Sequence, residues 1–494
     1  MKKILNYLAL FLVTINLSTL SYCQSNDIGS GIAINFPGAV GSRINLGNVY
    51  NDLNFPLSVE AWVYPTSWTV GGYSPIISTD NVGFGGSYYG FWFRFNSSGN
   101  LIFEIGDGSG AGGSDRRGKR TTSTVTLNKW THVAVVANSV TDIKFYFNGV
   151  LQPVVSTDGG ALNTSILHSS YPAYLGAQIT PSAEHDYTGL IDEIRLWNIA
   201  RSQTDLQDKM CEKLTGLEAG LIGNWRFDEN YLGTTVEDYS VSNIDGTTIG
   251  SATKSTSGAP IGDISVYTYT GDYTGISLSL NSAGGDKFKV NKIGNLPYGI
   301  HLYRVNTQPY FIEGLSDIPG YYYGVFSADN AAEVKYTFTY TYSYANGVVN
   351  EGNETEAHVY RRLDNSITSW SPQPASLDTL MNRLSKKNFT GRSEFVFNID
   401  SANSNGGTRF ENALHTSGAP ELVVNPNPAL NNVLVANLEP GIVFYITNID
   451  GAIVFSGTAD NASLQMDVSM LSSGLYFIVQ RNSNIWRYVQ FQKL

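Results

Sequence analysis

The sequence has few of the residues from which disulfides and metal sites are built. Among 494 residues there are two cysteines and six histidines, and the histidines are scattered along the chain. If Cys23 leaves with a cleaved N-terminal signal peptide, Cys211 has no partner within the chain, which excludes an intramolecular disulfide. A metal site rich in histidine or cysteine is likewise not expected.

Charged residues and long apolar runs are also sparse. Charged side chains make up 15% of the chain, and the formal net charge is −11. An acidic chain repels phosphate backbones, so nucleic acid is not an expected partner. Beyond the N-terminal segment, no stretch approaches 18 consecutive apolar residues, so no transmembrane span is expected in the mature chain.

The first residues predict a signal peptide over residues 1–23. Lys2 and Lys3 form a positive start, and the apolar segment that follows is too short to span a bilayer comfortably. Cleavage before Gln24 is predicted, and lipidation of Cys23 is the alternative. The expected location is therefore outside the cell, either secreted or at the cell surface.

The residues that are abundant favour strands and tight turns. The chain holds 50 glycines, 30 tyrosines and 23 phenylalanines. Residues 24–262 contain short runs in which apolar and polar residues alternate, separated by turn residues, and this pattern is typical of a sandwich or jelly roll. The runs are LSVEAWVYP, YGFWFRFN, LIFEIGDG, WTHVAVVAN, IKFYFNGV and LIDEIRLWN.

Several of these segments together resemble a known family. Their order along the chain is similar to that of the laminin-G-like, concanavalin-type jelly-roll domain, which implies two curved antiparallel sheets. The fold does not imply one function, because it serves binding modules, adhesins and enzymes. The segments are EAWVYP, KWTHVAVVANSVTDIKFYFNGVLQ, YTGLIDEIRLWNIARSQTDLQDKM and GLIGNWRFDEN. Within the third, RSQTDLQDKM predicts a helix capped by Ser202, with Asp205 three residues on.

Residues 263–400 predict a second β-sandwich. In KYTFTYTYSY, Tyr336, Phe338 and Tyr340 alternate with threonine, so one face is aromatic and the other hydroxylated. The segment is similar to accessory β-domains of large exported bacterial surface proteins. Residues 401–422 lack periodicity, are rich in serine, asparagine and glycine, and predict a linker.

The C-terminal block, residues 423–494, begins with VVNPNPALNNVLV. Pro426 and Pro428 predict a short, stiff entry into a new domain, followed only by strands. VNPNP, ITNIDGAIVFSG and LSSGLYFIVQ together resemble the type A sorting domain of type IX secretion. The resemblance implies a small β-sandwich that the type IX secretion machinery recognises. The whole chain is therefore predicted to be all-β and multidomain.

Five side chains in the first block suggest a ligand-binding surface. Within their strands, Trp92, Arg94, Glu104, His132 and Tyr146 lie on the faces opposite the apolar residues, and the NSSGN turn places Arg94 near Glu104. If their strands share the concave sheet, they form a polar and aromatic surface suited to sugar rings. The alternative is a half-exposed face that a loop covers. Rival aromatic residues on loops are Trp68, Tyr73, Tyr88 and Tyr89.

Asp192 is the one residue for which a metal is considered. By alternation it lies on the same strand face as Ile194 and Leu196, which are expected in the core. A carboxylate on that face needs a hydrogen-bond donor or a cation as its partner. Related folds often hold a structural calcium ion through a carboxylate and loop carbonyls. The alternative is a hydrogen bond to the backbone of a neighbouring loop. No other cofactor is expected.

Catalysis by paired carboxylates is not predicted. A glycoside hydrolase needs two carboxyls that face one cleft, but adjacent acids on a strand point to opposite faces. Glu104 and Asp107 are three residues apart, so on one strand they too would point to opposite faces. The other two candidate pairs, Asp192 with Glu193 and Asp228 with Glu229, are adjacent acids of this kind.

The expected function is that of an exported, non-catalytic binding or adhesion protein. Its expected partners are a glycan or a protein of the cell surface or matrix, together with the type IX secretion machinery. Two alternatives stay open. One is an extracellular enzyme acting on polysaccharides, and the other is a purely structural matrix protein.

Overall fold

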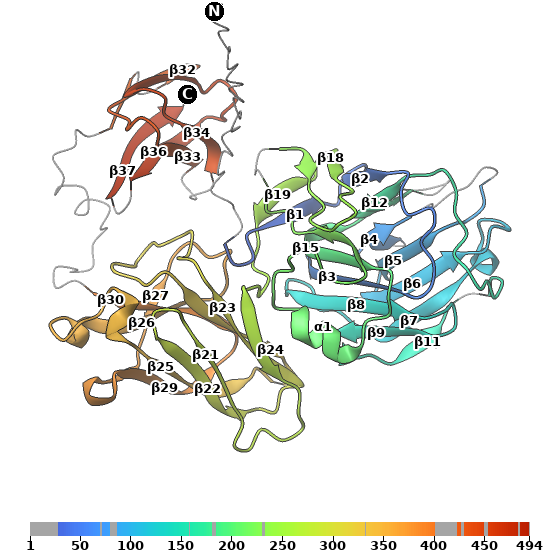
Figure 1. Cartoon of the computed structure of the whole chain (residues 1–494). Coiled ribbons are helices and arrows are strands. Elements are labelled where there is room, and N and C mark those ends of the chain that lie inside the picture. Colours follow the sequence, from blue (N-terminus) through green and yellow to red (C-terminus); the bar gives the residue numbers. More distant parts are fainter. Residues whose placement is uncertain are drawn as a thin grey trace, which may run out of the picture.

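The computed structural model of the chain is built from strands, with one α-helix in the part that it describes (Figure 1). The predicted signal peptide, all of the predicted linker but its last residue, and both prolines of the stiff entry lie outside the described residues. No helix in the described part is long and apolar enough to cross a membrane. The structure describes residues 28–69, 72–79, 86–157, 159–179, 184–229, 233–330, 332–400, 422–425, 429–448, 453–482 and 485–493.

The first block folds into a sandwich of two antiparallel sheets, named here the β3 sheet and the β5 sheet. In spatial order, the β3 sheet contains β10 (Val150–Leu151), β9 (Ile143–Phe147), β8 (Thr131–Ala137), β3 (Leu57–Pro65), β15 (Thr188–Trp197), β1 (Ile32–Pro37) and β19 (Thr253–Thr256), with β16 (Leu221–Trp225) paired to β15. The β5 sheet contains β11 (Val154–Ser156), β7 (Arg116–Thr124), β6 (Asn100–Gly106), β5 (Phe91–Asn96), β4 (Tyr73–Ser78), β12 (Ala173–Leu175), β2 (Arg43–Gly47), β18 (Gly246–Ile249) and β17 (Thr235–Val236).

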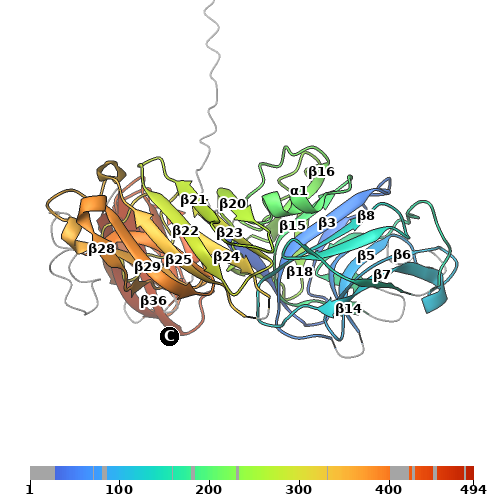
Figure 2. The same cartoon turned by 90° about the horizontal axis from the view of Figure 1, so that it is seen from below.

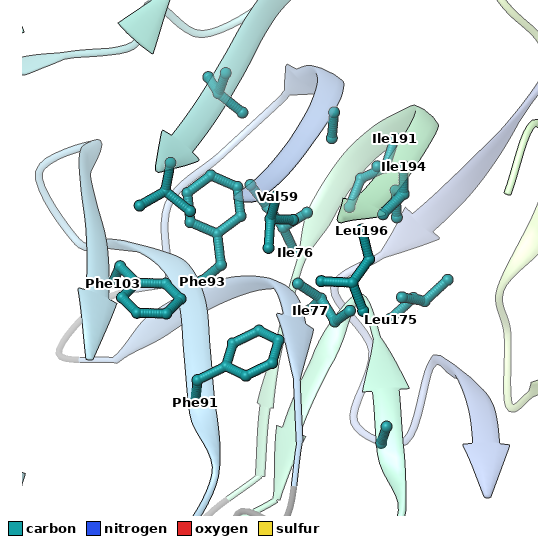
Figure 3. Close-up of a cluster of buried hydrophobic side chains, with 14 of the residues drawn as sticks. Val59, Ile76, Ile77, Phe91, Phe93, Phe103, Leu175, Ile191, Ile194 and Leu196 are labelled. Atoms are coloured by element: carbon teal, nitrogen blue, oxygen red, sulfur yellow. The ribbon is translucent and has the colours of Figure 1, made fainter. Parts of the chain in front are cut away.

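The inward faces of these two sheets form one core. Phe91 and Phe93 extend inward from β5, and Val59 and Leu196 meet them from β3 and β15 (Figure 3). These side chains are buried because successive residues of a strand point to opposite faces, as the alternating pattern predicts. The outward faces of the two sheets therefore lie on opposite sides of the sandwich.

Helix α1 (Gln203–Lys209) begins as predicted. The Ser202 hydroxyl accepts a hydrogen bond from the Asp205 backbone N–H at 3.1 Å, and the Asp205 carboxylate accepts one from the Ser202 N–H at 2.8 Å. This reciprocal pair satisfies two of the free backbone donors at the helix start. Leu206 and Met210 are both buried, so one face of the helix packs into the protein.

Strand β15 contains a bulge that the alternating pattern does not reveal. Glu193 adopts a left-handed φ of 49°, and the register with β3 shifts between Asp192 and Arg195. One extra residue reverses the faces beyond it. Ile191 and Ile194 consequently both join the core. The expectation that Asp192 shares a face with Ile194 is therefore wrong.

The second block is another antiparallel sandwich. Its larger sheet contains β20 (Ile264–Thr268), β23 (Gly299–Val305), β24 (Tyr322–Ala328), β30 (Ser393–Ile399), β26 (Ala357–Arg362) and β27 (Ser371–Gln373). The smaller contains β21 (Ser277–Asn281), β22 (Lys287–Gly294), β25 (Lys335–Thr341), β29 (Arg383–Thr390) and β28 (Ser376–Asp378). The predicted alternation of β25 is confirmed, because Tyr336, Phe338 and Tyr340 are buried and the residues between them are not.

The first two sandwiches share a buried cluster and are therefore not independent. Trp62, Trp130 and Met210 of the first pack with Tyr322 and Phe326 of the second. Figures 1 and 2 show the two sandwiches side by side, with α1 next to the second. The outward face of the β3 sheet is thus covered by protein.

The C-terminal block has its own core and two small antiparallel sheets. Val433, Val435 and Phe444 belong to this core, whose described members all lie within residues 422–491. One sheet contains β31 (Val423–Asn425), β32 (Asn432–Ala436) and β35 (Ser463–Asp467). The other contains β34 (Ile453–Thr458), β33 (Val443–Asn448), β36 (Gly474–Asn482) and β37 (Ile485–Lys493).

Candidate functional site

The five residues predicted to form one surface lie on two different sheets. Trp92 and Arg94 are on β5 and Glu104 is on β6, whereas His132 is on β8 and Tyr146 on β9. β5 pairs with β6 in one sheet, and β8 pairs with β9 in the other. Because the residues point outward from opposite sides of the sandwich, the prediction of a single surface is wrong.

Arg94 and Glu104 form a buried ion pair, as the hairpin predicts. Their Nη2 and Oε2 atoms are 2.5 Å apart, and the side chains are only 1% and 3% exposed. A second amino group of Arg94 donates to the amide oxygen of Gln178, on β13 (Ala177–Ile179). Burial lowers the pKa of Arg94 from its usual value, while the Glu104 charge opposes that shift. The ion pair with Glu104 and the hydrogen bond to Gln178 therefore fix the Arg94 guanidinium in place.

This buried pair positions two residues on the outward face of the β5 sheet, Tyr73 on β4 and Arg116 on β7, which are named here the rim. The Arg94 guanidinium lies 3.5 Å from the centre of the Tyr73 ring. Arg116 donates to the Tyr73 hydroxyl at 3.2 Å, and its Nε lies 3.7 Å from Glu104 Oε1. Both rim residues are partly exposed, so a ligand can reach them. Tyr73 was expected on a loop but lies on β4.

A half-buried histidine, His185, lies next to the rim. His185, on β14 (Glu184–Asp186), lies with its ring 5.3 Å from that of Tyr73. Burial lowers the pKa of His185, and the charges of Arg94 and Arg116 lower it further. The imidazole is therefore neutral at pH 7 and can both donate and accept a hydrogen bond.

Trp92 is fully buried beneath the rim. Its ring centre is 5.1 Å from that of the half-buried Tyr88, and no acceptor for its Nε1 is found among the described residues. Of the other rival aromatics, Trp68 packs on Phe95 with ring centres 4.9 Å apart. Tyr89 is half-buried beside Gly108. Trp92 and Trp68 therefore support the structure around the rim.

His132 belongs to a buried network under the second sandwich. Its Nε2 lies 3.1 Å from Glu60 Oε2, and the Trp197 indole donates to Glu60 Oε1 at 2.9 Å. Burial alone would raise the pKa of Glu60, but the hydrogen bond with His132 and the charge of Arg195 hold that pKa at about 2. No ligand can reach His132, because the packed sandwiches cover it.

Tyr146 is also a packing residue. Its ring contacts the Leu206 side chain of α1 in a small buried cluster with Ala134 and Val136. Burial raises the pKa of the Tyr146 hydroxyl from its usual value. The sequence pattern shows only that Tyr146 points outward, and the helix that covers it comes from much later in the chain.

Asp192 has protein donors on both carboxylate oxygens. One accepts from the Glu193 backbone N–H at 2.7 Å and the other from the Ser257 hydroxyl at 2.6 Å. Burial raises the pKa of Asp192 well above its usual value, and the charges of Glu193 and Asp228 raise it further. The described residues contain no cluster of three or more metal-ligating side chains. A calcium ion at Asp192 stays a prediction.

The remaining acids are engaged with buried cations or with loop backbone. Glu193 contacts Arg195 at 2.9 Å, and Glu229 contacts Lys254 at 2.6 Å. Asp228 accepts from the Ile32 backbone N–H at 2.9 Å, and Asp107 accepts from loop N–H groups. Glu193, Asp228 and Glu229 are thus held within the protein and do not line an open cleft.

The fold and the rim define a multidomain β-sandwich protein with a partly exposed polar and aromatic patch on the outward face of the β5 sheet. Residues 38–207 match the family model described as the concanavalin A-like lectin/glucanases superfamily. Residues 423–491 match the model of the secretion system C-terminal sorting domain. The chain therefore carries a concanavalin-like domain and a type IX sorting domain, and both resemblances are confirmed. The sorting domain indicates export to the cell surface or secretion.

Solved structures similar to this chain include a carbohydrate-binding protein, a sialidase CBM40 and a pentraxin. A Bacteroides ovatus protein assigned as carbohydrate-binding is 23% identical, with 47% of this chain and 61% of that one covered and a TM-score of 0.35. The Ruminococcus gnavus IT-sialidase CBM40 bound to α2,3-sialyllactose is 14% identical. The match covers 35% of this chain and 95% of that one, with a TM-score of 0.28. The Limulus polyphemus SAP-like pentraxin is 16% identical. The match covers 36% of this chain and 80% of that one, with a TM-score of 0.25. The chain thus spans less than two thirds of the Bacteroides protein. No curated protein matches the chain.

Proposed function

We propose that this protein is a non-catalytic binding protein, exported through the type IX system, that binds glycan at the rim of its first domain. The observation that carries the proposal is the buried Arg94–Glu104 pair, which holds Tyr73 and Arg116 on the outward face of the β5 sheet. Binding sites are precise when packed supporting residues fix the groups that touch the ligand. Here the contacting groups are a phenol ring and a guanidinium.

The chemistry of the rim suits sugars. The Tyr73 ring offers an apolar surface with a polar hydroxyl, and Arg116 and His185 offer donors for sugar oxygens. Trp92, Arg94 and Glu104 act beneath them as positioning residues, because each is buried. This assignment keeps three of the five predicted residues in the site and excludes His132 and Tyr146.

A non-catalytic role is supported by the surroundings of the candidate acids. A glycoside hydrolase keeps one carboxylic acid as proton donor and a second carboxylate beside an accessible sugar. Glu104 instead neutralises a buried arginine, and Glu193 and Glu229 each contact a buried cation. None of the three is free to face a polysaccharide.

The test uses the full-length protein without its predicted signal peptide, because the first domain shares a core with the second. A glycan array followed by calorimetry should identify at least one glycan that binds. Arg116→Ala should weaken that binding about tenfold or more, the effect of losing roughly 1.4 kcal/mol. Arg383→Ala is the matched control, since Arg383 is an exposed arginine on the second sandwich.

Two results would contradict the proposal. One is the absence of binding to any arrayed glycan, which would leave adhesion to a surface protein as the function. The other is an unchanged affinity in both Arg116→Ala and Tyr73→Phe. The second variant keeps the aromatic ring that lies over Arg94 and removes only the hydroxyl that Arg116 contacts. It therefore tests the polar contact of the rim while the packing is retained.

A further inference from the structure

An open hollow of about 450 Å³ lies where the first two sandwiches meet. Val150 and Gln203 line it from the first sandwich, and Tyr269, Tyr298 and Asn330 line it from the second. The site therefore exists only while the two sandwiches are docked. Its volume is in the range of small-ligand sites, roughly 300 to 1,000 Å³. It is called here the junction groove.

One wall of the junction groove is fixed by hydrogen bonds to the turn between β9 and β10. The side-chain amide nitrogens of Gln203 and Gln207 both donate to the Gly149 carbonyl at 2.9 Å. The Tyr269 hydroxyl crosses from the second sandwich and donates to the Asn148 carbonyl at 2.7 Å. Gln203 is thereby held in one orientation, and no donor to its amide oxygen is found in the described part of the chain.

The opposite wall is a turn in an unusual backbone conformation. Asn295 and Leu296 are consecutive residues with positive φ, 60° and 35°. Glycine adopts such a conformation easily, whereas leucine does so rarely and under strain. Leu296 is 56% exposed and Tyr298 is 51% exposed, so burial in the core does not explain these side chains. Residues with strained backbone conformations cluster at ligand-binding and active sites, so this turn is a candidate for a ligand contact.

The turn is nevertheless held firmly. The Asn295 amide donates to the Glu333 carbonyl at 2.7 Å, and the Tyr273 hydroxyl donates to the Pro297 carbonyl at 3.0 Å. The Tyr298 backbone N–H donates to the Ala328 carbonyl at 2.8 Å. Leu296 and Tyr298 are therefore presented on a prepared surface, which reduces the entropy lost on binding.

We propose that the junction groove binds an uncharged saccharide, with Tyr298 as the stacking surface. The side chains that line the groove are aliphatic, aromatic, hydroxyl or amide groups, and none is acidic or basic. A sugar ring has an apolar C–H face that suits Tyr298 and Leu296, and hydroxyls that suit the amides of Gln203 and Asn330. A phosphate or carboxylate would find no cation there to offset its desolvation.

This second site goes beyond the proposed function and does not depend on the rim. The rim lies on the β5 sheet, whereas the first-sandwich wall of the groove comes from α1 and the β3 sheet. The two sites share no residue. A chain with both can engage two parts of a glycan, or two glycans, at once.

The experiment is calorimetric titration of the full-length protein with uncharged tetrasaccharides of glucose, mannose, galactose and xylose. At least one should bind, and Tyr298→Ala should weaken its binding about tenfold or more. Tyr344→Ala is the matched control, because Tyr344 is 42% exposed on the same sandwich but does not line the groove. Arg116→Ala at the rim should leave this binding unchanged.

Leu296→Gly separates a binding role from a structural one. Glycine relieves the left-handed strain, so the melting temperature should stay the same or rise while the affinity for the tetrasaccharide falls. The proposal is overturned if none of the four sugars binds, or if Tyr298→Ala and Leu296→Gly both keep the parent affinity. Binding that only Arg116→Ala abolishes would retain the rim and reject the groove.

Discussion

The indole ring of Trp62 in the first sandwich contacts the phenyl ring of Phe326 in the second edge to face, with ring centres 5.1 Å apart. Both side chains are buried in the cluster that the two sandwiches share. Lys129 and Asp329 add an ion pair at 3.3 Å across the same junction. The two sandwiches within residues 28–400 therefore form one structural unit.

Phe326→Ala should destabilise this unit as a whole. Removal of a buried phenyl ring leaves a cavity and costs about 3–5 kcal/mol of unfolding free energy. Urea unfolding followed by tryptophan fluorescence should show the two sandwiches losing stability together. Leu380→Ala is the control, because Leu380 is 95% exposed and its loss should change little. Unfolding of the second sandwich alone, with the first unaffected, would contradict a shared core.

The stability of the junction should fall in acid because of His301. Burial, with a smaller contribution from the neighbouring His132, lowers the pKa of His301 from its usual 6.5 to about 3. Between these two values the unfolded chain binds a proton that the folded chain does not. The unfolding free energy from this group therefore decreases as pH falls from 6.5 towards 3, by up to about 1.4 kcal/mol per pH unit.

His301→Phe should remove that dependence. The variant loses a hydrogen bond to Tyr269 and starts from a lower stability, so the measurement is the slope of unfolding free energy against pH between 6 and 4. The slope should become shallower by up to about 1.4 kcal/mol per unit. Asp228 contributes with the opposite sign because burial raises its pKa to about 7, but it is present in both proteins and cancels. His358→Phe, at an exposed histidine, is the control.

The buried pair beneath the rim should show strong coupling. Glu104→Met leaves the Arg94 charge buried without its partner, and such a loss typically costs about 3–5 kcal/mol. Arg94→Met combined with Glu104→Met should cost much less than the sum of the single changes. Urea unfolding of the four proteins in this cycle gives the coupling energy. Arg383 and Asp378, an exposed pair at 2.9 Å, should couple by less than about 1 kcal/mol.

Local features of this protein could be predicted from its sequence. The Arg94–Glu104 pair, the capping of α1 by Ser202 and the alternation along β25 each depend on residues that are close in the chain. Hairpin turns and strand periodicity fix such relationships without knowledge of the rest of the fold. The concanavalin-like and sorting domains were identified for a related reason, since their motifs lie within short segments.

The errors arose where distant parts of the chain decide the outcome. His132 alternates with core valines as an exposed sheet residue would, but the second sandwich, whose first strand begins 132 residues later, covers that face of the sheet. The bulge at Glu193 adds one residue to β15 and leaves no mark on its apolar pattern. Strict alternation of faces along the strand therefore put Asp192 on the same face as Ile194, which is wrong. The junction groove could not be predicted, because its two walls meet only after the sandwiches dock.

Deletion of residues 423–494 should keep the protein inside the cell envelope. The sorting domain has its own core, so its loss should leave the first two sandwiches folded and able to bind glycan. After passage through the inner membrane, the truncated chain lacks the signal for the type IX machinery and should accumulate in the periplasm. Cell fractionation with immunoblotting measures this, and transfer of residues 423–494 to a periplasmic reporter should direct that reporter outward. Normal secretion of the truncated protein would show that export depends on another segment.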